Sequence, residues 1–220
     1  MTLDHVQIVF QLISFLFAIS VHESAHAWMA SRSGDPTARM LGRISLNPLR
    51  HIDPVGTVIM PLLAAVTGFP MLGWAKPTPV NPLNFKNPVA DDIKVSVAGP
   101  VSNFLVAFLA AGLLSVVALA WRMVRSTSSA PLVGSWMQPV VLLLQALMFI
   151  NVVLAVFNLL PIPPLDGSHV IRHFLSQPVL RVYDQIGIFG LLALVYFGGR
   201  FLTALIQPFI HFFNSLVVGF

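Results

Sequence analysis

Long apolar segments alternate with shorter polar segments along this chain, and three of the apolar segments are long enough to cross a lipid bilayer. They cover about residues 6–30, 95–121 and 136–160. As a helix, the first would span roughly 37 Å at 1.5 Å per residue, more than the hydrocarbon core of about 30 Å. The pattern therefore predicts an all-α polytopic membrane protein with three transmembrane helices in its core.

The region between the first two predicted helices, about residues 42–88, has a different pattern. Its apolar stretch at 56–67 is interrupted by Pro61 and is shorter than a crossing, which needs about 20 residues. We interpret this region as a re-entrant or hairpin unit. The proline-rich stretch 74–80 is predicted to be extended, because a proline disfavours helix at the residue before it. It is interpreted as a connector or, alternatively, as a strand that pairs with a substrate.

The sequence that follows the third predicted helix forms a C-terminal helical segment. A short helix is expected at 168–176, and residues 186–218 are apolar for longer than one crossing requires. Gly198–Gly199 and Pro208 interrupt this stretch. One long broken helix and one crossing followed by an interfacial helix both fit the pattern. No stretch has the composition of a soluble module, so residues 1–220 are expected to form a single membrane-embedded domain.

The composition supports lipid as the solvent for much of the surface. Hydrophobic residues make up 56% of the chain and charged residues 9%, whereas soluble domains carry about 25% charged residues. The net charge of +4 comes from basic residues scattered beside apolar segments, as in loops that flank a membrane rather than in a nucleic-acid surface. The absence of cysteine excludes disulfides and thiolate metal sites.

A cluster of ionisable residues lies inside the first apolar segment. His22, Glu23 and His26 form an H-E-x-x-H sequence, and Glu23 is the only glutamate in the chain. On a helix, residues four apart lie roughly 40° apart around the axis, so His22 and His26 can bind one metal ion. Glu23 lies about 100° round from His22, which suits a group that handles a water molecule on the metal.

A catalytic zinc site usually has three protein ligands and one open position, so a third ligand is expected. Asp166 is the best candidate, because no lysine or arginine occurs between Arg125 and Arg172 and this carboxylate has no basic neighbour in sequence. An isolated carboxylate in an apolar region is a functional-site hypothesis by default. His169 and His173 are alternatives, since they are close by and have suitable side chains.

A shared metal site would constrain the topology. For the third ligand to meet the two histidines, the first and third predicted helices must end at the same face and run parallel. An odd number of crossings then separates them. The segment 95–121 is one crossing, so the stretch 56–67 should not cross fully. Most basic residues then lie at the end of the bundle that carries the metal site, and only Arg122 and Arg125 fall in the opposite loop. By the positive-inside rule, the site is predicted to face the cytoplasm, with the protein in the cell (inner) membrane.

Two further motifs accompany H-E-S-A-H at 22–26. They are A-G-P-V-S-N at 98–103, and N-L-L-P at 158–161 followed by L-D-G at 165–167. With these three motifs in order on three apolar segments, the chain resembles the site-2 protease family of intramembrane zinc metalloproteases. It is similar to the compact bacterial or archaeal members, which lack the PDZ or CBS domain of other members.

The resemblance implies a fold of three core transmembrane helices and a specific set of roles. Zinc would be bound by His22, His26 and Asp166, with Glu23 as the general base. The expected activity is hydrolysis of peptide bonds in transmembrane proteins or peptides. The expected partners are therefore the lipid bilayer and such a substrate, and no nucleic acid.

Two asparagines and two other functions complete the set of hypotheses. Asn103 and Asn158 are uncharged amides in apolar helices, which makes them candidates to stabilise a transition state; hydrogen bonding between helices is the alternative.

An ion- or proton-coupled transporter would predict internal symmetry, and the sequence has none. A non-catalytic scaffold would predict loss of a motif residue, and all are present.

Overall fold

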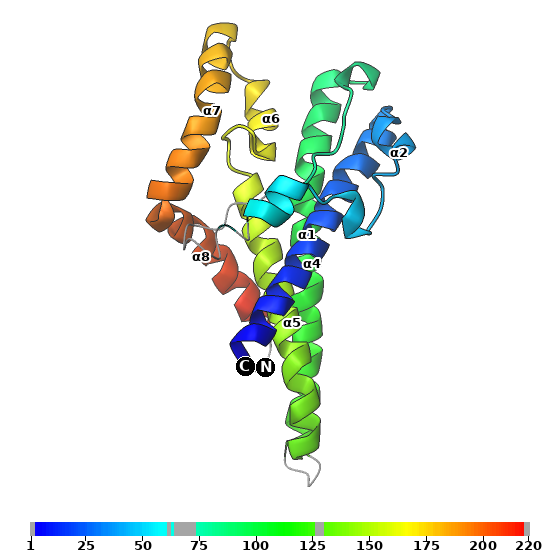
Figure 1. The fold of residues 1–220 in the computed structure, drawn as a ribbon, viewed down its shortest axis with the longest axis vertical. Helices are drawn as coiled ribbons and strands as arrows, with labels where there is room; N and C mark the ends of the chain where they lie inside the picture. The colour runs from blue at the N-terminus through cyan, green and yellow to red at the C-terminus, as the bar shows by residue number, and fades with distance from the viewer. Residues whose placement is uncertain (1–2, 61–62, 64–73, 126–129, 218–220) are drawn as a thin grey trace.

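Three long helices form the centre of the molecule. The computed structural model describes residues 3–60, 63, 74–125 and 130–217. The central helices are α1 (Leu3–Ser33), α4 (Pro88–Val124) and α5 (Ala130–Asn158), and each contacts the other two. In the described residues all regular elements are helices, and four are long and apolar enough to cross a membrane. The predicted all-α multi-pass membrane fold is confirmed (Figure 1).

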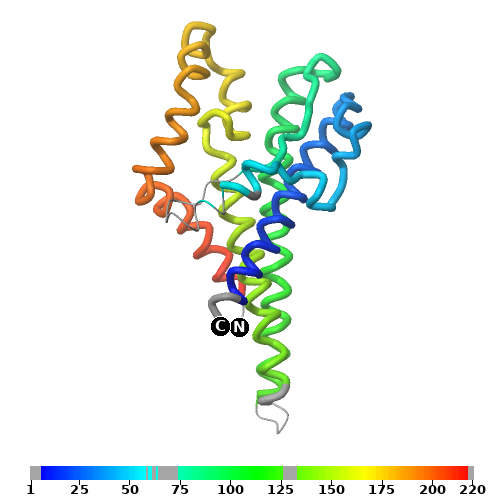
Figure 2. The backbone as a smooth tube through the Cα atoms, viewed as in Figure 1, coloured from blue at the N-terminus to red at the C-terminus, as the bar shows by residue number. Residues whose placement is uncertain are grey.

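The central helices are longer than the apolar pattern predicted. α4 begins at Pro88 instead of residue 95, because Asn87 precedes a proline at the first helical position. The Asp91 carboxylate also accepts a hydrogen bond of 2.8 Å from the Asn87 N–H, which satisfies a backbone donor at the helix start. With 37 residues, α4 is about 55 Å long at 1.5 Å per residue. Together with α5 it extends well past the start of α1 (Figure 2).

The three central helices alternate in direction. α1 and α5 run parallel, and α4 runs antiparallel to both, so the C-terminal ends of α1 and α5 lie at the same end as the start of α4 (Figure 1). This is the arrangement that a site shared by the first and third predicted helices requires. Small side chains of α4 pack against α5 and α8, and the buried set comprises Ala107, Ala110, Ala111, Leu114, Met148, Val152, Val156 and Phe213.

The C-terminal part consists of three helices. α6 (Asp166–Arg172) is the predicted short helix, beginning two residues earlier than expected. α7 (Gln177–Phe197) and α8 (Gly199–Leu216) are separate helices that meet at Gly198. They diverge in direction (Figure 1). α7 is the fourth candidate span, whereas α8 returns to the bundle and packs on α4 through aromatic contacts such as Phe108–Phe213, whose ring centroids are 4.7 Å apart.

The region between α1 and α4 contains only short elements in its described residues. These are α2 (Thr37–Met40), η1 (Pro48–Arg50), the π-helical turn η2 (Pro54–Ile59) and η3 (Pro82–Asn84). The stretch 74–80 is neither helix nor strand, and the extended conformation expected from its prolines stays a prediction. Half of the apolar stretch 56–67, which was expected to be re-entrant, lies outside the described residues.

Candidate metal centre

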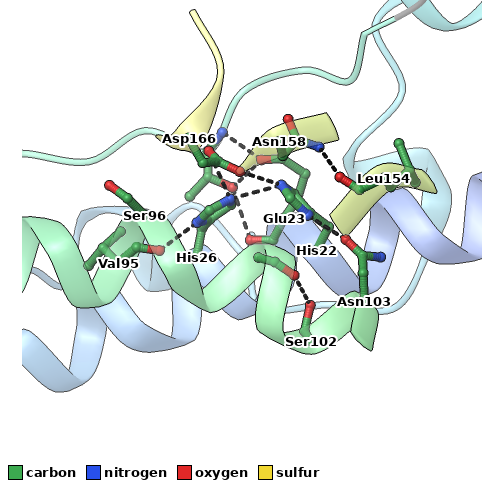
Figure 3. Close-up of polar contacts among 12 residues, drawn as sticks. His22, Glu23, His26, Val95, Ser96, Ser102, Asn103, Leu154, Asn158 and Asp166 are labelled. Atoms are coloured by element: carbon green, nitrogen blue, oxygen red, sulfur yellow. Dashed lines mark hydrogen bonds and ion pairs between the residues drawn. The ribbon is translucent and has the colours of Figure 1, made fainter. Parts of the chain in front are cut away.

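Two histidines of α1 present their Nε2 atoms to one point. His22 Nδ1 lies 2.6 Å from Asn103 Oδ1, and His26 Nδ1 lies 2.7 Å from the carbonyl oxygen of Val95 (Figure 3). Both partners are acceptors, so both imidazoles carry their proton on Nδ1. The Asn103 oxygen is fixed as the acceptor because its amide nitrogen donates to Ala18 O and Asn151 Oδ1. The lone pairs of both Nε2 atoms are therefore free for a metal.

Gly99 lets α4 approach the two imidazoles closely. A Cβ atom at this position would lie 2.4 Å from His26 Nε2 and 2.7 Å from His22 Nε2. Any side chain here would occupy the space between the two nitrogens and α4. The A-G-P motif therefore has a direct steric role at the centre.

Asp166 closes the third side of the site. It is the first residue of α6, and its carboxylate oxygens lie 3.0 Å from His22 Nε2 and 3.4 Å from His26 Nε2. The next residue, Gly167, packs on the backbone at the end of α5: a Cβ there would lie 2.2 Å from the carbonyl oxygen of Leu159. The Asp-Gly pair thus joins the ligand to a position that only glycine can occupy.

The donor set fits a divalent cation. The ligand atoms of His22, His26 and Asp166 all lie within 4.8 Å of one another. Two lone-pair nitrogens face each other at 3.0 Å, and Asp166 Oδ2 is buried without a hydrogen-bond partner. A cation would satisfy all of these groups, and zinc favours this combination of nitrogen and oxygen ligands.

Glu23 is held by a residue far away in sequence. The Thr78 N–H donates to Glu23 Oε2 at 2.9 Å, and the Thr78 hydroxyl lies 2.6 Å from the same oxygen. Among the described residues, the other carboxylate oxygen, Oε1, accepts no hydrogen bond. Glu23 therefore has one oxygen fixed and one free beside the metal ligands.

The segment that carries Thr78 is itself anchored by a buried arginine. Arg43 is 5% exposed and donates to the carbonyl oxygens of Arg50, Lys76 and Pro77. The Lys76 N–H donates to the carbonyl oxygen of His51 at 2.8 Å. With Thr78 bound to Glu23 and prolines at 77 and 79, no N–H from 76 to 79 is left to pair with a substrate strand.

Asp35 anchors the far end of the same segment. This fully buried carboxylate accepts hydrogen bonds from the Asn81 N–H, the Asn84 side chain and Thr37. Burial raises the pKa of Asp35, but these hydrogen bonds lower it by more, so the net shift is downward. The loop after Thr78 is thereby tied to the end of α1.

The remaining candidates fall in different places. Asn103 uses both its oxygen and its amide nitrogen within the bundle, where it orients His22. Asn158 donates to the Leu154 carbonyl of its own helix and lies near the ligands (Figure 3). His173 Nε2 lies 2.7 Å from Asp92 Oδ2, and His169 Nδ1 lies 4.0 Å from the same atom. Among the described residues, neither histidine joins the metal-binding group.

A cleft of about 300 Å³ opens beside the metal ligands. One wall comes from the stretch that contains Thr78, and the opposite wall comes from the start of α6 and the facing side of α4. Its lining residues are Glu23, His26, Pro77, Thr78, Val80, Asp92, Val95, Ser96, Pro164, Asp166 and His169. The cleft thus reaches both the metal position and the Glu23 carboxylate.

Several functional contacts could not be read from the sequence. Thr78 is 55 residues from Glu23, and its only local signal is its position between two prolines. Asn151, which supports Asn103, carries no motif. The contact between Asp92 and His173 joins residues 81 positions apart and has no local signal either.

Comparisons with known proteins agree with this geometry. The sequence profile of Peptidase family M50 matches residues 10–197. The Bacillus subtilis (strain 168) protein YwhC, named as a candidate zinc metalloprotease, is 38% identical over 182 residues, which are 81% of this chain and 75% of YwhC. Rip2 of Mycolicibacterium smegmatis and Rip2 of Mycobacterium tuberculosis (strain H37Rv), which are named likewise, are 27% and 28% identical over 84% and 85% of this chain. The matched parts are 64% and 65% of those relatives.

None of the solved protein structures matches this chain. The family assignment therefore comes from sequence, and the metal-binding geometry is an independent observation. Because the family profile covers most of the chain and YwhC is similar over most of both proteins, this chain belongs to peptidase family M50.

Proposed function

We propose that this protein is an intramembrane zinc metalloprotease in which His22, His26 and Asp166 bind the zinc ion and Glu23 is the general base. The observation that carries the proposal is the convergence of three ligand atoms within 4.8 Å of one another beside a cleft that Glu23 also lines. Bound zinc would polarise the scissile carbonyl and lower the pKa of an attacking water. The named relatives and the peptidase family support this chemistry.

The protein residues supply orientation and proton transfer. Asn103 and the Val95 carbonyl hold the two imidazoles in the tautomer that leaves Nε2 free. Thr78 holds one oxygen of Glu23, and the other oxygen takes the proton of the attacking water and later delivers it to the leaving amine.

Asn158 is the better placed of the two asparagines to contact a reacting peptide. The amide nitrogen of Asn103 is already engaged with Ala18 and Asn151, whereas Asn158 makes one hydrogen bond, to its own helix. We therefore propose that Asn103 orients His22 and that Asn158 donates to the oxyanion of the transition state.

We further propose that the substrates are transmembrane proteins or peptides cleaved near the cytoplasmic face of the cell membrane. The His22 and His26 positions lie within a candidate span, and the cleft opens near the end of the bundle where α1 and α5 finish. A substrate must unwind locally to present its backbone there. The excess of basic residues in the loops at this end supports the cytoplasmic orientation.

The test is cleavage of a membrane-embedded peptide by purified protein in lipid nanodiscs. Glu23→Gln should reduce kcat by at least about a thousandfold, because the general base is lost while the ligands stay. Asp184→Asn makes the same chemical change on α7, outside the centre, and should keep wild-type activity. Undiminished cleavage by Glu23→Gln would exclude the proposed mechanism.

Zinc content gives a second, independent measurement. Asp166→Asn should lower the zinc retained after dialysis, because one of three ligands is weakened. Full stoichiometric zinc in this variant would indicate that His169 or His173 is the third ligand instead. Comparing membrane proteomes of cells with wild-type protein and with Glu23→Gln would then identify substrates.

A further inference from the structure

The third ligand stands on an element that cannot hold its position alone. α6 has seven residues and begins with Asp166. Isolated helices of this length are not stable in water, since nucleation is costly and few hydrogen bonds follow. The position of the Asp166 carboxylate therefore depends on what α6 packs against.

α6 packs mainly against α4. The polar residues on the facing sides of these two helices have the same spacing. Asp166 and His173 are seven residues apart, which places them about 20° apart around the helix axis and two turns apart in height. Asp92 and Gly99 of α4 have the same separation. Gly99 touches the metal-binding histidines, so Asp92 stands two turns from the centre, on the side of α4 that faces the site.

A polar contact between His173 and Asp92 joins α6 to α4 two turns away from the centre. His173 Nε2 and Asp92 Oδ2 are 2.7 Å apart, and the side chains are only 22% and 16% exposed. His169, one turn before His173, lies 4.0 Å from the same carboxylate oxygen. On the other side of α6, Arg172 pairs with Asp184 of α7, but these side chains are 36% and 45% exposed.

We propose that Asp92 is a positioning residue for the metal centre: by binding His173 it docks α6 on α4 and so holds Asp166 at the metal. This inference rests on the proposed role of Asp166 as a zinc ligand. The contact is partly shielded from water, so it contributes more than an exposed ion pair. Interactions that orient metal ligands typically change metal affinity by about 10- to 100-fold.

The experiment measures zinc affinity by competition with a chromophoric chelator, using the full-length protein in nanodiscs. Asp92→Leu and His173→Leu should each weaken zinc binding by about 10- to 100-fold. Asp92→Asn keeps an acceptor for the imidazole N–H and should stay close to wild type. Arg172→Leu is the matched control, because it removes the other anchor of α6, and it should change zinc affinity by less than about threefold.

Two combinations separate a positioning role from general damage to the fold. The double variant Asp92→Leu/His173→Leu should bind zinc no more weakly than either single variant, because both substitutions remove the same contact. Exchanging the pair, Asp92→His with His173→Asp, should recover most of the zinc affinity. If Asp92→Leu does not fold, the exchanged variant decides: a folded protein with zinc affinity still reduced would overturn the proposal.

The outcomes also distinguish this inference from the proposed function. Wild-type protein that binds no zinc would refute the zinc site itself. Wild-type binding with unchanged affinity in Asp92→Leu and His173→Leu would leave the zinc site standing and refute the positioning role. Equal losses in Arg172→Leu and Asp92→Leu would also refute it, because α6 would then depend on all of its anchors alike.

Discussion

The two walls of the cleft are held in different ways. On the wall beside Glu23, the proposed general base, the segment around Thr78 is fixed by buried groups: Arg43 donates to three carbonyl oxygens, and Asp35 accepts from the loop that follows. On the opposite wall, α6 carries Asp166 and is anchored by partly exposed contacts at its C-terminal end, among them His173 with Asp92. One wall is an interior network and the other is a short docked helix.

This difference indicates which parts of the site are positioned by folding alone and which depend on a bound metal ion. The hydrogen bonds of the Thr78 segment are satisfied without any ligand, so the base should be in place before zinc binds. The Asp166 carboxylate has a buried oxygen without a hydrogen-bond partner, and a cation supplies the missing interaction. We therefore expect α6 to be the part of the site whose stability depends on zinc.

The largest effect on zinc affinity is expected at Gly99, which touches both histidines but belongs to neither wall. Gly99→Ala would place a Cβ within 2.7 Å of both Nε2 atoms, so zinc affinity should fall by at least about a hundredfold. Gly112→Ala is the control on the same helix, because nothing lies within 4 Å of that position. Zinc titration of both variants checks this, and equal affinities would contradict the geometry.

Removing zinc should distinguish the two walls directly. After chelation, amide hydrogen exchange in α6 should become about tenfold faster or more, because the interaction that holds Asp166 is lost. Exchange at Lys76 and Thr78 should change by less than about twofold, since their N–H groups bind protein acceptors. Equal acceleration in both places would show that the walls are one cooperative unit.

The sequence predicted the elements of this site better than their connections. Apolar length alone identified α1, α4 and α5, and helical spacing alone placed His22 and His26 on one face. Asp166 was singled out because no basic residue lies near it in sequence. These are properties of single segments, which periodicity and composition can report.

Contacts between distant segments had no such signal. Nothing in the spacing links Thr78 to Glu23. An amide in an apolar helix has several possible partners, so the sequence left Asn103 with two interpretations, a transition-state group or a hydrogen bond between helices. In the structure, the Asn103 oxygen lies 2.6 Å from His22 Nδ1 and its amide nitrogen donates to Ala18 and Asn151, so the hydrogen bonds run between helices. The early start of α4 at Pro88 was missed because Asp91, Asp92 and Lys94 interrupt the apolar pattern there. Asn87 before a proline is nevertheless a helix-start signal.

A smaller effect is expected from Thr78, which holds Glu23 without touching zinc. Thr78→Val removes the hydroxyl and keeps the shape, so kcat should fall by about tenfold, the value of one hydrogen bond to a charged group. KM and zinc content should stay within about twofold, because neither the cleft nor the ligands change. Thr78→Ser should restore kcat; a loss in Thr78→Ser as large as in Thr78→Val would contradict the role of the hydroxyl.

The smallest effect on activity is expected at Asp35, which ties the loop after Thr78 to the end of α1 and contacts none of the proposed zinc ligands. Because hydrogen bonds lower its pKa in the folded protein, Asp35 stabilises the fold above its unfolded pKa of about 3.9, and this contribution is lost as the pH falls through the folded value. Thermal unfolding in nanodiscs should therefore show stability that declines below about pH 4 in the wild type and declines less in Asp35→Asn. At neutral pH, Asp35→Asn should cost about 1–2 kcal/mol, because the amide accepts fewer of these hydrogen bonds, and zinc affinity should be unchanged. A loss of zinc affinity in Asp35→Asn would mean that the wall of the base also positions the metal ligands, and the two walls would not be independent.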